Sequence, residues 1–152
     1  MNTLIDFNRV QEQIKKHEGL RLRVYRDTVG VNTIGYGHNM NTPYPWNIQA
    51  KYEKNVSQIT KQDAEEIFQV DFLNALYIAR NSIETFDSLP GPKKEAFINM
   101  AFNLGNRIKY FRKMINAINR FDYLTAANEM ENSIWARQVG KRARELADII
   151  RF

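Results

Sequence analysis

The chain has 152 residues, of which 43% are hydrophobic and none is cysteine. This length suits one domain, or two small lobes that share a core, and the lack of cysteine excludes disulfides and suits folding in a reducing cytosol. The 22 lysines and arginines outnumber the 17 acidic residues. The resulting net charge of +5 favours a polyanionic partner such as nucleic acid, an anionic membrane or a bacterial wall.

The N-terminal residues 1–6 lack the basic start and the apolar run of a signal peptide. No run of about 18 apolar residues occurs anywhere in the chain. We therefore expect a soluble protein with no export signal and no stable membrane anchor.

A short amphipathic helix is predicted over residues 6–17. Asp6 is a suitable N-cap, and Val10 and Ile14 fall on one helical face. The helix ends just after Glu18, because a glycine and a run of strand-forming residues follow. This arrangement presents Glu18 at the C-terminal end of the helix.

The segment from His17 to His38 reads H-E-G-L-R-L-R-V-Y-R-D-T-V-G-V-N-T-I-G-Y-G-H. Its alternation predicts a strand, a tight turn near residues 27–30 and a returning strand through residues 33–36. A helix end followed by such a hairpin brings Glu18 opposite the hairpin. The geometry thus predicts a cleft with one acid on each side.

The three residues in this segment that carry chemistry are Glu18, Asp27 and Thr33. Two carboxyl groups and a hydroxyl across a cleft are the parts that a glycoside hydrolase needs. Taken singly, each has a simpler structural explanation: a helix-end glutamate, a turn-forming aspartate and a strand threonine. Glu18 favours the functional interpretation, because an acid at a helix C-terminus opposes the helix dipole.

The next segment, residues 39–57, is predicted to be irregular. Pro43 and Pro45 preclude a regular helix, so any helix begins after Trp46 and runs through residues 50–53.

The clearest helix is predicted over residues 60–81. Thr60 and Asp63 approximate a capping box, Ile59 can serve as the hydrophobic staple, and apolar residues then recur at helical spacing. A helix of this length spans on the order of 30 Å. It is long enough to join an N-terminal lobe to a helical C-terminal lobe.

The remainder of the chain is predicted to be helical. A break at residues 89–92 precedes a helix over residues 93–104, with Gly105 as its C-cap. We expect the apolar residues of this helix to be core: Phe97, Met100, Ala101 and Leu104. Shorter helices are predicted over residues 112–120, 123–132, 133–138 and 141–150.

The pattern E-G-x-R-L-x-x-Y-x-D-T-x-G-x-x-T-I-G-x-G-H at residues 18–38 closely resembles the lysozymes of tailed bacteriophages, of the T-even phage type. The spacing of Glu18, Asp27 and Thr33 is the catalytic signature of that family, and N-M-A-F-N-L-G at residues 99–105 is similar to its central helix. The resemblance implies an α+β, mostly α, two-lobed fold in a single domain of 1–152. A β-rich lobe (14–59), a helical lobe (1–13 and 82–152) and a connecting helix (60–81) are expected.

By this resemblance the protein is an endolysin that hydrolyses the β-1,4 bond between N-acetylmuramic acid and N-acetylglucosamine in peptidoglycan, causing host lysis and phage release. Glu18 would be the general acid, Asp27 the carboxylate that orients or activates water, or else the nucleophile, and Thr33 the residue that binds the water. The residues alone do not decide between inversion and retention, and the resemblance favours inversion.

The resemblance also implies roles outside the motif. It pairs His38 with Asp71 as a buried structural contact, and it directs Asn39, Phe102 and Asn103 towards the substrate. The family's C-terminal stretch carries an arginine that reaches the catalytic glutamate, which makes Arg142 a candidate for the site. Arg142 can equally be part of a solvated basic face with its neighbours Lys141 and Arg144.

Three further positions receive no catalytic role. His17 is predicted to be a solvated helix-end residue, and Met114 and Glu129 depart from the polar cleft lining of the family. No cluster has metal-ligand spacing, so neither a metal nor a cofactor is expected.

The expected partner is the glycan strand of peptidoglycan, with no nucleic acid. A monomer is expected, held in the host cytoplasm until a holin-type pore protein gives it access to the wall. Two alternatives of other classes stay open: a nucleic-acid-binding helical protein, and a protein whose cationic C-terminal segment, residues 137–152, disturbs membranes.

Overall fold

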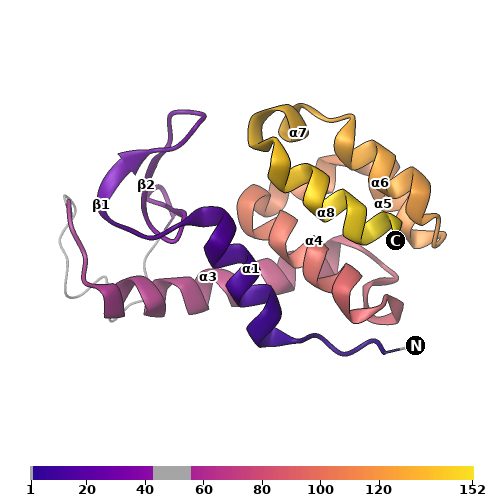
Figure 1. Ribbon diagram of the computed structural model, residues 1–152, viewed down its shortest axis with the longest axis horizontal. Helices are drawn as coiled ribbons and strands as arrows, with labels where there is room; N and C mark the ends of the chain where they lie inside the picture. Colours follow the sequence, from indigo (N-terminus) through magenta and orange to yellow (C-terminus); the bar gives the residue numbers. More distant parts are fainter. Residues whose placement is uncertain (1, 43–55) are drawn as a thin grey trace.

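The structure is a computed structural model that describes residues 2–42 and 56–152, and it consists of a small sheet region beside a larger body of helices (Figure 1). The sheet holds three antiparallel strands in the order β1 (Arg21–Arg26), β2 (Asn32–Gly35) and β3 (His38–Asn39). The long helix α3 (Lys61–Ser82) runs from the sheet region into the helical body (Figure 1). This is the predicted mostly helical α+β fold.

The first helix, α1 (Phe7–Glu18), begins and ends as the sequence predicts. The Asp6 side chain accepts a hydrogen bond from the backbone N–H of Arg9, and Val10 and Ile14 are buried. The helix ends at Gly19, whose positive φ of 71° suits glycine and whose N–H donates to the carbonyl of Lys15. Glu18 is therefore the last residue of α1.

The hairpin of β1 and β2 follows directly. Tyr25 pairs with Thr33 in the antiparallel ladder, and the turn is closed by the N–H of Asp27, which donates to the carbonyl of Val31. The third strand was not predicted: it has only two residues, and His38 pairs with Ile34 in β2. Such a short strand has too few residues to produce an alternating pattern.

The long helix α3 connects two hydrophobic cores. Thr60 is its N-cap, as predicted, and its side chain accepts a hydrogen bond from the N–H of Asp63. The 22 residues of α3 span roughly 33 Å at about 1.5 Å per residue. Ala64 and Ile67 pack in the small core under the sheet, together with Ile34 and Ile59. The next turns of α3 enter the large core of the helical body at Phe68, Phe72, Ala75, Ile78 and Ala79. The exact lobe boundaries remain a prediction.

The helical body is built around α4 (Gly91–Leu104), in which the predicted core residues Phe97, Met100, Ala101 and Leu104 are all buried. The helix begins two residues earlier than predicted, because the carbonyl of Pro90 accepts the N–H groups of both Lys93 and Lys94. The other elements are η1 (Phe86–Ser88), η2 (Gly105–Tyr110), α5 (Arg112–Asn119), α6 (Tyr123–Glu131), α7 (Ile134–Val139) and α8 (Lys141–Arg151).

Most of the proline-containing segment, for which the sequence predicts irregular structure and a late helix, lies outside the described residues. In the part of the chain that the structure describes, no helix is both long and apolar enough to cross a membrane.

Candidate active site

Glu18, at the C-terminal end of α1, is held by two neighbours from distant parts of the fold. Its carboxylate accepts a hydrogen bond from a guanidinium N–H of Arg142 in α8, and both side chains are about nine-tenths buried. On another side lies Gly37, where an added Cβ would overlap the Glu18 carboxylate. Gly37 also has a φ of 68°, a conformation that glycine adopts without strain. The carboxyl group therefore has a fixed position in a largely buried site.

Arg142 is oriented in turn by Asn99 of α4, which is fully buried. The Nε and Nη2 atoms of Arg142 lie 3.0 and 2.7 Å from the side-chain oxygen of Asn99. Arg142 is thus part of the site and not of a solvated basic face. Asn99 received no role from the sequence, although a polar residue between the apolar core residues Ile98 and Met100 is the signal that identifies it.

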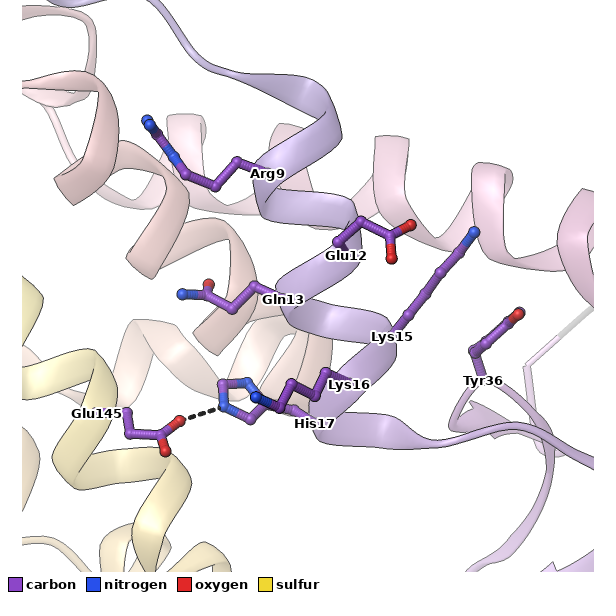
Figure 2. Close-up of a pocket in the computed structure, with 8 residues that line it drawn as sticks. All are labelled: Arg9, Glu12, Gln13, Lys15, Lys16, His17, Tyr36 and Glu145. Carbon is purple, nitrogen blue, oxygen red and sulfur yellow. Dashed lines mark hydrogen bonds and ion pairs between the residues drawn. The ribbon is translucent and has the colours of Figure 1, made fainter.

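His17, immediately before Glu18, is not the solvated residue that the sequence predicts. Its side chain is only 12% exposed, its Nε2 lies 2.7 Å from Oε2 of Glu145 in α8, and its Nδ1 lies 3.0 Å from Nδ2 of Asn99. The prediction failed because both partners belong to helices far along the chain. Figure 2 shows the contact with Glu145 at one end of a pocket of about 870 Å³, which is lined mainly by α1. The hydrogen bond from His17 lowers the pKa of Glu145, and Lys141 also lowers it.

Asp27 lies in the turn after β1 and is exposed to solvent. Its Oδ1 accepts hydrogen bonds from the N–H groups of Val29 and Val31, at 3.0 and 2.8 Å. Asp27 therefore does form the turn, as its simpler explanation required. Its second oxygen, Oδ2, has no hydrogen-bond partner within the described chain and remains able to bind water.

Tyr25, which the sequence did not single out, lies in the electrostatic field of both acids. Burial raises the pKa of Tyr25 most, the charge of Glu18 raises it further, and Asp27 adds to this effect, while Arg21 lowers it. Tyr25 is therefore a group on which the charges of the helix-end acid and the hairpin acid both act.

Thr33 is buried in β2 opposite Tyr25. Its hydroxyl donates a hydrogen bond to the carbonyl of Val31 at 2.8 Å. Because a hydroxyl has one donor and two acceptor positions, the lone pairs of Thr33 stay available to a water molecule.

The other predicted residues lie around this region. His38 is buried and its Nδ1 is 2.8 Å from Oδ2 of Asp71 in α3, so the contact that the resemblance implied is present. The Asn39 side chain is exposed and accepts the N–H of Asn41.

Two α4 residues, Phe102 and Asn103, are partly buried at the junction of helices. The Phe102 ring packs on Phe68 with centroids 5.4 Å apart, and Asn103 Oδ1 accepts the indole N–H of Trp135 at 2.6 Å. Met114 lies in the large core, which accounts for its apolar side chain. Glu129 is partly exposed on α6.

No group of three or more His, Asp or Glu side chains in residues 2–42 and 56–152 has the arrangement of a metal site. The chemistry that these residues support is acid–base chemistry by carboxyl groups.

The small sheet, the connecting helix α3 and the helical body form a lysozyme-like fold. The family model described as phage lysozyme matches residues 15–148. The chain therefore belongs to the phage lysozyme family, and it is an enzyme that cleaves peptidoglycan.

Three relatives illustrate the family. A probable T4-type lysozyme 1 of Dictyostelium discoideum is 30% identical over 161 residues, covering 93% of this chain and 92% of the relative. An endolysin of Acyrthosiphon pisum secondary endosymbiont phage 1 is 28% identical over 130 residues, covering 85% of this chain and 80% of that protein. The pre-baseplate central spike protein Gp5 of Enterobacteria phage T4 is 27% identical over 154 residues, covering 91% of this chain but 27% of that longer protein.

Proposed function

We propose that the protein is an endolysin that hydrolyses the β-1,4 bond between N-acetylmuramic acid and N-acetylglucosamine. The observation that carries the proposal is the largely buried Glu18 carboxyl group, which Arg142 and Gly37 fix at the end of α1, and which the hairpin with the exposed Asp27 follows. Endolysin is also the printed description of one relative, of which this chain covers 80%.

The two carboxyl groups have different environments, and this difference gives them different catalytic roles. The largely buried Glu18 donates the proton to the leaving glycosidic oxygen, while the solvent-exposed Asp27 stays ionised and takes a hydrogen bond from water through Oδ2. Thr33 accepts the second hydrogen of that water with its free lone pairs. A water that donates one hydrogen bond to each residue keeps a lone pair for the anomeric carbon. As it attacks from the face opposite the leaving group it passes a proton to Asp27, while Glu18 protonates the glycosidic oxygen, and this opposite-face attack gives inversion.

The remaining residues either bind the sugar or stabilise the structure around the site. Asn39, Phe102 and Asn103 contribute to the sugar subsites, and Arg142 orients Glu18. His38 and Asp71 form a structural pair that joins β3 to α3.

The bond that is broken can be identified by mass analysis of the fragments released from purified peptidoglycan. Disaccharides with N-acetylmuramic acid at the reducing end are the expected product. Reducing N-acetylglucosamine ends, anhydro sugars or free stem peptides would contradict the proposal, because they indicate a glucosaminidase, a transglycosylase or an amidase.

For the route to the wall, we propose that the monomeric protein waits in the host cytoplasm and crosses the membrane through a holin-type pore. Expression in the bacterial cytoplasm should cause lysis only when a pore-forming protein is co-expressed. Lysis without the pore protein would contradict this route.

The membrane-disrupting alternative is weakened by the packing of α8. Four of its apolar residues, Ala143, Leu146, Ala147 and Ile150, are buried, so most of its apolar face packs on the core and is not available to lipid. Leakage of anionic vesicles caused by a Glu18→Gln variant would restore this alternative. Nucleic-acid binding would be supported by salt-sensitive retention on DNA without any action on peptidoglycan.

A further inference from the structure

The polar contacts around Glu18 continue beyond Arg142 as a chain of hydrogen bonds whose direction is fixed. A guanidinium has only donors, so the atom of Asn99 that faces Nε and Nη2 of Arg142 must be the oxygen. The Asn99 amide nitrogen therefore points the other way. It lies 2.9 Å from Oε1 of Gln13 and 3.0 Å from Nδ1 of His17.

The orientation of Asn99 determines the protonation of His17. Because Asn99 donates to Nδ1 of His17, that nitrogen carries a lone pair and no proton. The proton of the neutral ring lies on Nε2, which donates to Glu145 at 2.7 Å. The hydrogen bonds thus run without interruption from Arg142 through Asn99 and His17 to Glu145, while Arg142 also donates to Glu18.

A second proton on His17 breaks this chain. It would place an Nδ1–H against the amide N–H of Asn99, two donors 3.0 Å apart. Asn99 cannot relieve the conflict by turning its amide over, because the NH₂ group would then face the Arg142 cation. Asn99 has no solvent-exposed surface, so the loss of this acceptor leaves a buried N–H unsatisfied.

The charges around His17 do not remove this conflict. Glu145 attracts an imidazolium, but it does so from the Nε2 side of the ring and offers no acceptor to an Nδ1–H. Lys141 lies 3.6 Å from the same carboxylate and weakens its field. The charged or titratable groups that face or line this site are Glu18 and Lys16 beside His17 on α1, Arg142 and Glu145 on α8, and Arg9, Glu12, Lys15 and Tyr36 around the pocket of Figure 2.

We propose that His17 is a positioning residue that holds Glu18 in its working geometry through Asn99 and Arg142, and that it does so only while the imidazole is neutral. The inference rests on the proposed role of Glu18 as the general acid. Activity then falls when His17 takes up a second proton, because the imidazolium cannot accept the hydrogen bond from Asn99.

Two substitutions separate the states of His17. His17→Gln is neutral at every pH and offers an oxygen to Asn99 and an N–H to Glu145. His17→Lys is always cationic and has no acceptor. The control is Glu12→Gln, which adds the same unit of charge as His17→Lys on the same helix without touching the hydrogen-bond chain.

The measurement is kcat and KM against pH on a soluble, uncharged glycan fragment. At neutral pH, His17→Lys should lower kcat about tenfold and should change KM by less than about twofold. The loss in kcat is smaller than the roughly 10²-fold loss that a misplaced catalytic group can cause. His17→Gln should keep most of the wild-type kcat and lose the part of the acid limb that belongs to histidine. Glu12→Gln should reproduce the wild-type profile. A normal kcat in His17→Lys, or an unchanged acid limb in His17→Gln, would overturn the proposal.

A second readout uses the wild-type protein and does not depend on catalysis. The ¹⁵N chemical shifts of the His17 ring at neutral pH should identify the Nε2–H tautomer, and acidification should disturb the Asn99 side-chain amide signals together with the ring. An Nδ1–H tautomer would overturn the inference, and so would Asn99 amide signals that stay unchanged on acidification. Both results can be obtained even if the variants fail to fold. Should Glu18→Gln stay fully active, the proposed function fails instead, and the tautomer can still be read.

Discussion

Arg142 in α8 donates a hydrogen bond to the carboxylate of Glu18 at the end of α1, although 124 residues separate the two in the chain. Both side chains are largely buried, so each charge offsets the desolvation cost of burying the other. The contact fixes the first helix of the molecule against the last one. It also predicts that the two residues are energetically coupled.

Replacement of Arg142 by alanine should therefore be strongly destabilising, because it leaves the buried carboxylate without a partner. A loss of about 3 kcal/mol is expected for breaking a pair of this kind from one side. The check is urea unfolding of Arg142→Ala, Glu18→Gln and the double variant. In the double variant the loss should be clearly smaller than in Arg142→Ala, and strictly additive free energies would show that the pair contributes no coupling.

Gly37→Ala should reduce activity by displacing Glu18, since its Cβ would overlap the carboxylate. A loss on the order of 10²-fold in kcat is expected for such a displacement. Gly105→Ala is the matched control: its φ of 59° is also positive, but nothing lies within 4 Å of its added Cβ. Both variants should lose roughly 1 kcal/mol of stability to backbone strain. Equal kcat values for the two variants would show that Gly37 does not limit the position of Glu18.

Asp71→Asn tests the contact between His38 and α3. His38 is buried, so weakening its hydrogen bond should cost about 1–3 kcal/mol in the free energy of unfolding. The kcat on peptidoglycan should change little, because in our proposal neither residue touches the sugar. A variant with normal stability and lost activity would show that His38 takes part in catalysis.

The contact between Lys15 and Glu65 predicts a pH-dependent contribution to stability. A hydrogen bond from Lys15, at 2.8 Å, is the largest cause of the lowered pKa of Glu65. A carboxyl group whose pKa is lowered by folding stabilises the native state above its unfolded pKa, and this stabilisation is lost as the pH falls through the folded pKa.

Glu65→Gln should therefore melt below the wild type at neutral pH, and the difference should shrink as the pH falls through the lowered pKa of Glu65. The effect is less than about 1 kcal/mol, because the Glu65 side chain is 43% exposed. Thermal melts at neutral and at acidic pH provide the check, and an equal difference at both would exclude this carboxyl group as the cause.

Local patterns predicted the elements that depend on local sequence. The capping residue Thr60 and the apolar spacing after it identified α3, and Asp6 with Gly19 delimited α1. The family motif identified Glu18 and Asp27 as candidates, although their catalytic roles remain predictions.

Contacts between distant segments could be predicted only where the family resemblance implied them, as for Arg142 with Glu18 and His38 with Asp71. His17 reads as an ordinary helix-end residue because its partners lie 82 and 128 positions away, in α4 and α8. Asn99 lies within a helix whose other buried residues are mostly apolar, and only the fold reveals that its amide joins Arg142 to His17. The side-chain hydrogen bonds that organise the site come from three helices, so no single stretch of sequence contains them.

The proposed mechanism depends most on Glu18 as the proton donor. Glu18→Gln removes the proton and hardly changes the volume, and general acid catalysis contributes about 10² to 10⁴-fold to rates. The decisive measurement is kcat/KM of this variant on purified peptidoglycan, beside Glu12→Gln, the same chemical change at an exposed position of α1. We predict that Glu18→Gln loses at least about 10²-fold while it melts no lower than the Arg142→Ala variant, and that Glu12→Gln behaves as the wild type. Wild-type kcat/KM in a folded Glu18→Gln variant would contradict the proposed mechanism.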